Sequence, residues 1–83
     1  MDYDKFYQWL IEEKSLSNRS AKDVVSRCKR ICTKILSVET MSESTIDMLN
    51  SNEIFLNCSM FIKSQLRRAV SLYIEFEGER KNG

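Results

Sequence analysis

The clearest hydrophobic pattern in this chain lies between residues 18 and 36. Apolar residues recur there every three or four positions, and the remaining positions are mostly polar or charged. Such spacing predicts one long helix with a single apolar face, and Ser17 is placed to cap its first free N–H groups. The apolar set comprises Ala21, Val24, Val25, Cys28, Ile31, Cys32 and Ile35.

A shorter amphipathic pattern precedes it and predicts a first helix over residues 3–14, with Asp2 as the N-cap. Phe6 and Leu10 lie four positions apart and define its core face. Neighbouring aromatic and aliphatic residues widen the apolar arc beyond what one packed face needs.

The last helix is predicted over residues 59–77, with Gly78 as its stop signal. Its basic residues lie off the apolar stripe, on the remaining faces. The stripe comprises Ile62, Leu66, Ala69, Tyr73 and Phe76.

The middle of the chain is harder to interpret, because its apolar residues are few and its Ser and Asn residues are many. We expect two short helices there, over residues 43–50 and 52–57, with a structured loop as the alternative for the second segment. Ser44 with Asp47 has the spacing of a capping box at the start of the first.

Composition favours an all-α fold. The chain has 83 residues, no proline and two glycines, whereas a β-rich domain needs turn residues at short intervals. Residues 1–83 are therefore expected to form one helical domain, a four- to five-helix bundle with a small core.

The N-terminal stretch lacks the basic segment and apolar run of a signal peptide. No stretch approaches the ~18 apolar residues of a membrane span. We therefore expect a cytoplasmic protein with reduced thiols and no membrane association. Beginning at Met1 and ending in a polar tail, the chain fits either a complete gene product or a trimmed fragment.

No catalytic pattern is present. The chain has no histidine, so Ser-His and Cys-His dyads are excluded, and it has no Gly-rich phosphate loop. Cys28, Cys32 and Cys58 make a poor zinc set, and the first two belong to an apolar stripe typical of buried, reduced cysteine. We expect no enzymatic activity, no metal and no cofactor.

Charge alternates along the chain although the total is only +1. Residues 17–38 carry a net +5 and residues 58–74 a net +3, while residues 1–16 carry −2 and residues 39–57 carry −4. If the two basic helices pack side by side, their Lys and Arg residues can line one surface for nucleic-acid phosphates. The alternative is an ordinary solvated face, which the pI of about 7.7 also fits.

Two pieces of the chain resemble one family. "FYQWLIEEKSLSNRSAKDVVSRCKRI" is similar to the opening of the core-binding domain of tyrosine recombinases, the phage integrase type. "SMFIKSQLRRAVSLYIEF" resembles the last helix of that domain. The resemblance implies a SAM-like four-helix bundle whose second and last helices face double-stranded DNA, in a phage or mobile element.

The resemblance also implies which residues face DNA, and they come from the two helices that are basic here. The chain departs from the family because it lacks the separate catalytic domain, so it cannot recombine DNA by itself. The implied contacts are Arg19, Ser20, Lys22, Ser26, Arg27, Lys63, Ser64 and Arg67.

A second hypothesis is a small phage or bacterial adaptor or inhibitor that uses the same bundle to bind a protein. Trp9, Ile11, Phe61 and Ile74 lie at the margins of their apolar stripes. They either complete the core or form an exposed patch for a protein partner or a second copy of the chain.

Overall fold

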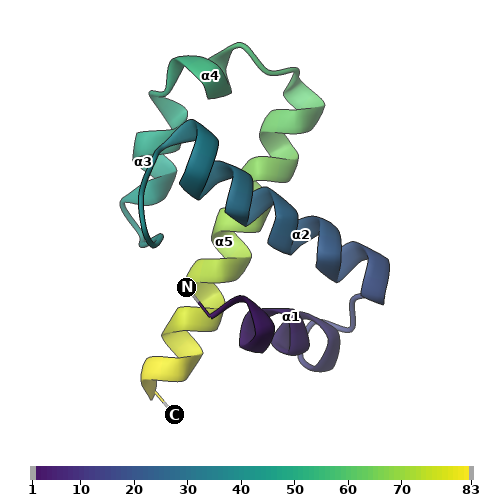
Figure 1. Cartoon of the computed structure of the whole chain (residues 1–83). Helices are drawn as coiled ribbons and strands as arrows, with labels where there is room; N and C mark the ends of the chain where they lie inside the picture. Colours follow the sequence, from purple (N-terminus) through teal and green to yellow (C-terminus); the bar gives the residue numbers. More distant parts are fainter. Residues whose placement is uncertain (1, 83) are drawn as a thin grey trace.

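The computed structural model describes residues 2–82, and in that range the chain is a small all-α globule with no strand (Figure 1). The fold class predicted from the pattern is thus confirmed at the level of a small helical bundle. In the described range no helix is long and apolar enough to cross a membrane. The helices are α1 Tyr3–Glu12, α2 Asn18–Arg30, α3 Thr45–Asn50, α4 Glu53–Leu56 and α5 Met60–Asn82, and a π-helical turn, η1 Ile31–Ile35, extends α2.

Of the two longest helices, α5 crosses α2 near its own middle and near the C-terminal end of α2 (Figure 1). At the crossing the Cys28 thiol lies 3.5 Å from the backbone carbonyl of Ala69. Ala21 and Ala69 are also fully buried, and such small side chains let helix backbones approach closely. Helix α1 packs against both long helices, and α3 packs against α5.

Aromatic rings fasten α1 to the C-terminal half of α5. The Phe6 ring lies 5.2 Å from both Tyr73 and Phe76, and the Tyr73 contact is edge-to-face. Trp9 packs 5.6 Å from Phe76, and its indole N–H donates to Glu79 at 2.5 Å. Edge-to-face and tilted ring pairs of this kind add to the stability that area burial alone provides.

Both predicted N-caps of the first two helices are confirmed. Asp2 accepts a hydrogen bond from the Lys5 amide, and Ser17 accepts one from the Ser20 amide, each at 3.1 Å. These bonds satisfy amides that have no partner within the helix.

Helix α1 and the extended α2 are each followed, two or three residues after their last helical residue, by a serine in the left-handed region. Ser15 has φ 56° and Ser37 has φ 54°. The next residue, Leu16 or Val38, then donates its amide to a carbonyl six positions back. This bond and the partial burial of the apolar residue compensate for a backbone conformation that normally favours glycine.

The predicted capping box of Ser44 and Asp47 is wrong, since Ser44 makes no side-chain cap to α3. The reciprocal hydrogen bonds at the start of α3 instead join Ser42 and Thr45. The Ser42 amide donates to Thr45 Oγ1 at 2.8 Å, and the Thr45 amide donates back to the Ser42 carbonyl at 3.0 Å. Thr45 is buried and takes the role assigned to Asp47, so α3 begins at Thr45.

Helix α4 is a single turn held by Asn52. The Asn52 Oδ1 accepts from the amides of Ile54 and Phe55, and Nδ2 donates to the Ile35 carbonyl at 3.1 Å. One side chain thus caps α4 and ties it to the end of η1.

Gly78 does not end the last helix, which continues to Asn82. The stop was predicted because glycine favours helix ends, yet contacts beyond Gly78 hold the helical form. Glu79 accepts from Trp9, and Glu77 pairs with Arg80 across the glycine. Tertiary packing therefore overrides the local preference.

Candidate nucleic-acid interface

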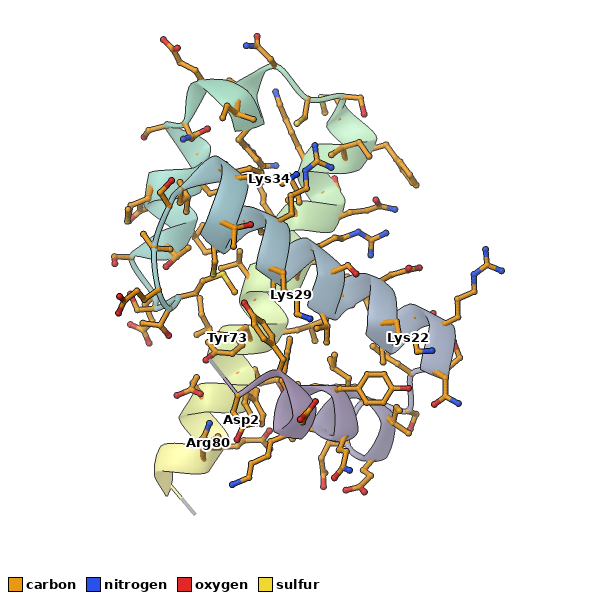
Figure 2. The ribbon with its side chains drawn as sticks, viewed as in Figure 1. Asp2, Lys22, Lys29, Lys34, Tyr73 and Arg80 are labelled. Atoms are coloured by element: carbon orange, nitrogen blue, oxygen red, sulfur yellow. The ribbon has the colours of Figure 1, made fainter. Side chains whose placement is uncertain are left out.

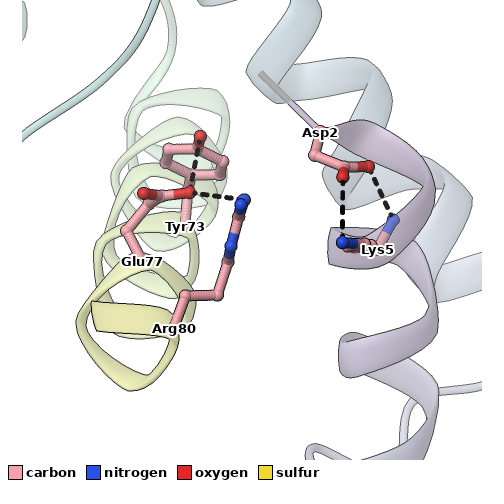
Figure 3. Close-up of polar contacts among 5 residues, drawn as sticks. All are labelled: Asp2, Lys5, Tyr73, Glu77 and Arg80. Carbon is pink, nitrogen blue, oxygen red and sulfur yellow. Dashed lines mark hydrogen bonds and ion pairs between the residues drawn. The ribbon is translucent and has the colours of Figure 1, made fainter. Parts of the chain in front are cut away.

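Ion pairs and unpaired cations occupy different parts of the molecule. The pairs in the described range are Lys5 with Asp2, Lys14 with Glu75, and Arg80 with Glu77, so all lie on α1, the link after it, and the C-terminal half of α5. Figure 3 shows two of them, together with the Tyr73 hydroxyl that donates to Glu77 at 3.1 Å.

None of the basic residues on α2, on η1 or on the N-terminal half of α5 has an acidic partner within ion-pair distance in the described range. Along the outer face of α2, Arg19, Lys22, Ser26 and Arg30 are all exposed. Figure 2 shows Lys22, Lys29 and Lys34 at successive levels of α2 and η1. From Arg19 to Lys34 this basic stripe is about 22 Å long at 1.5 Å per residue.

A groove between α2 and α5 continues the stripe. Ser20 and Arg27 line it from α2, and Gln65 and Arg68 line it from α5. Asp23 also lines the groove and is its acidic residue. The two basic helices therefore do share an edge, and that edge offers guanidinium, hydroxyl and amide groups that can donate to phosphate oxygens.

Lys22 and Ser26 lie on the other flank of α2, beside α1. Together with Lys29 they line a shallow groove against Tyr3 and Tyr7. The Lys29 ammonium lies 5.1 Å from the centre of the Tyr3 ring, a cation–π contact that orients the side chain. This flank shares the exposed face of α2 with Arg19 but does not belong to the α2–α5 groove.

Lys63 and Arg67 lie on the flank of α5 that faces α4. The Arg67 guanidinium stacks 5.0 Å from the Phe55 ring, and the Lys63 ammonium lies 5.9 Å from it. Arg67 also donates to Asn50 at 3.0 Å. The residues implied by the family resemblance are thus divided: Lys63 and Arg67 brace α4, while exposed Ser64 lies between the two flanks.

Gln65 and Arg68 take the place on the groove that Lys63 and Arg67 were expected to hold. The helical spacing contained the signal, because Arg68 follows Gln65 by three positions and lies a wide angle from Lys63 around the helix. Only the crossing of α2 over α5 reveals which flank of α5 meets α2.

The four residues of the expected partner patch do not come together. Trp9, Ile11 and Ile74 are partly buried and pack against the core, whereas Phe61 is 70% exposed. Phe61 lies 13 positions before Ile74 on α5, about 20 Å along the helix axis. Large exposed apolar residues gather instead near α4 and the start of α5: Ile54, Leu56, Met60 and Phe61.

The two stripe cysteines are buried, as the pattern predicts. Burial raises the pKa of the Cys28 thiol to about 12, with a smaller contribution from Cys32, so the thiol stays protonated and unreactive at neutral pH. Burial likewise raises the pKa of Tyr3 to about 12. In the described range, no group of three acidic or thiol side chains is close enough to hold a metal ion.

Comparisons of the chain with protein-family models, with curated proteins and with solved structures find no match.

Proposed function

We propose that this chain is a non-catalytic DNA-binding module that contacts the DNA backbone through the exposed face of α2 and the adjoining flank of α5. The observation that carries the proposal is the segregation of charge. The three ion pairs of the described range lie elsewhere, and the cations of α2, η1 and the first half of α5 have no acidic partner within ion-pair distance there.

The dimensions of this surface suit a duplex. A basic helix about 22 Å long fits a major groove about 12 Å wide, which admits one α-helix. Arg27 and Arg68 line the α2–α5 groove of the protein. With α2 in the major groove of the DNA, they would lie beside its phosphates, which guanidinium groups bind bidentately. Phosphate contacts of this kind fix the position of the protein without reading sequence.

We also propose the finer fold, a SAM-like bundle of the integrase core-binding type, and with it a regulatory or accessory role in a phage or mobile element. Its support is the sequence resemblance of the first two helices and of α5. The proposed DNA surface differs from the family pattern on α5, where Gln65 and Arg68 replace Lys63 and Arg67.

Fluorescence anisotropy with a labelled blunt duplex, over a series of salt concentrations, tests the proposal. We expect a log–log slope steeper than about −3, because each neutralised phosphate contributes about −0.9. Replacing Arg27 and Arg68 with alanine should make the slope shallower by about 2.

The matched control is Lys5→Ala with Arg80→Ala, which removes the same number of charges from the ion-paired side of the molecule. This control should leave the slope unchanged. Equal weakening by both pairs would show a response to net charge alone and would contradict the proposed surface. Absence of binding at ~50 mM salt would overturn the proposal and favour a protein partner.

A further inference from the structure

Phe61 is exposed at the start of α5 and shares a helix face with two residues of the α2–α5 groove. It lies four positions before Gln65 and seven before Arg68, and residues with this spacing share one face of a helix. Both of those residues line the groove against α2. Phe61 is 70% exposed and has no place in the core, so its ring is accessible to a ligand.

The surroundings of Phe61 are suited to a nucleic-acid strand. Arg68 lies about 10 Å further along the helix axis, the length of about three stacked nucleotides at 3.4 Å each. Phe61 also stands in the first turn of a long helix, whose free N–H groups and dipole favour negative charge. A flat apolar ring is thus combined with cationic and N–H groups at nucleotide spacing.

We propose that Phe61 stacks on an unpaired base, so that the preferred ligand is DNA in which a duplex adjoins a single-stranded stretch. The inference rests on the proposed function, because the duplex portion is held by the α2–α5 surface. In an intact duplex every base is stacked on its neighbours, and the ring gains nothing. At a gap or junction the exposed base face is free, and aromatic side chains bind such faces with little regard to sequence.

The position of Phe61 depends on its local packing. Ser59 caps α5 by accepting from the Ile62 amide at 3.2 Å, and Ile62 packs against the core. The first turn of α5 is therefore anchored on one side while Phe61 projects from another. The neighbouring exposed residues Ile54 and Leu56 belong to α4 and have no place on the groove flank, so they serve as controls.

The test compares two DNA probes by anisotropy: a blunt duplex, and the same duplex with a three-nucleotide single-stranded gap. We expect the native chain to bind the gapped probe about tenfold more tightly, the effect of one good aromatic–base contact. Phe61→Ala should abolish that preference and leave blunt-duplex affinity unchanged. Phe61→Trp should retain the preference, and Leu56→Ala should behave as the native chain.

A 2-aminopurine base placed in the gap gives a second readout. Its fluorescence should change on binding of the native chain, and Phe61→Ala should abolish the change. Equal affinity of the native chain for both probes would overturn the stacking inference while the proposed function stands. Loss of binding to both probes in Phe61→Ala, with helical content retained, would also overturn it, because Phe61 would then serve general affinity. No binding of the native chain to either probe would overturn both proposals.

Discussion

The Cys28 thiol on α2 donates to the backbone carbonyl of Ala69 on α5, and this contact marks the point where the two helices cross. Both residues are buried, and Ala69 is 1% exposed. The crossing sets which flank of α5 meets the basic helix. Its geometry therefore decides which cations can act together on the proposed DNA surface.

A larger side chain at the crossing of α2 and α5 should destabilise the fold. Ala69→Leu places three extra carbon atoms where the backbones meet, and overpacking of this kind costs about 1–3 kcal/mol. Chemical denaturation followed by circular dichroism measures the loss. Ser71→Leu, on an exposed position of the same helix, is the control and should change the free energy of unfolding by less than about 0.5 kcal/mol.

Alkaline pH should unfold the protein in a way that depends on Cys28. The pKa of its thiol is raised from 9.0 to about 12 by burial, so the protonated folded form is favoured. The stabilisation is complete below pH ~9 and is lost as pH rises toward 12, a change of up to about 4 kcal/mol. Tyr3, raised from 10.0 to about 12, acts in the same direction.

Thermal unfolding at pH 8 and pH 11 measures this loss. Cys28→Ala should be less stable than the native chain at pH 8, because the substitution leaves a small cavity. Between pH 8 and pH 11, however, the variant should lose less stability than the native chain does. Cys58→Ala removes a thiol outside the crossing and controls for the absence of a thiol as such. An identical alkaline loss in Cys28→Ala and the native chain would contradict the assignment.

Glycine in place of either serine with a left-handed backbone conformation should stabilise the protein. Ser15→Gly and Ser37→Gly each relieve the steric cost of positive φ and should raise the free energy of unfolding by about 1 kcal/mol. Ser71→Gly, within α5, should instead lower it by about 0.5–1 kcal/mol. Equal destabilisation by all three changes would show that the φ values are wrong.

Gly78→Ala should stabilise α5, since an added Cβ meets nothing within 4 Å and the helix continues past this position. The expected gain is about 1 kcal/mol, with a small rise in helical circular dichroism. If Gly78 instead ended the helix in a left-handed cap, alanine would destabilise the protein. The sign of the change therefore distinguishes the two conformations.

Removing the acidic residue of the α2–α5 groove should strengthen DNA binding. Asp23 repels phosphate beside Arg27, so Asp23→Asn should raise duplex affinity by about fivefold at low salt. Anisotropy measures the change, and the effect should shrink as salt screens the charge. Glu12→Gln, at an exposed position of α1, removes the same charge and should leave the affinity unchanged. An equal gain in that variant would show that affinity responds to net charge and not to the groove.

Helix positions were largely predictable because the apolar spacing in α1, α2 and α5 is regular. The cap at Asp2 and the cap at Ser17 followed from local chemistry alone. The end of α5 could not be predicted in this way, because it depends on Trp9 meeting Glu79 across the fold.

The sequence predicted which helices form the candidate site, but not which residues of α5 belong to it. Segment charges identified α2 and α5, yet they could not separate Arg68 from Arg67, which differ by one position and face opposite flanks. A single residue step turns a side chain by about 100° around a helix. The crossing angle decides which side faces the groove, and no local pattern encodes that angle.

The contacts of Trp9 with the end of α5 have a consequence for folding during synthesis. Trp9 and Glu79 are 70 positions apart, and Phe6 packs on Phe76 across a similar separation. Helix α1 is translated before α5 and cannot complete its aromatic contacts until α5 has been translated. Until α5 has been translated, the nascent chain lacks the aromatic partners of Phe6 and Trp9, so α1 docks onto α5 only after the intervening residues have been made.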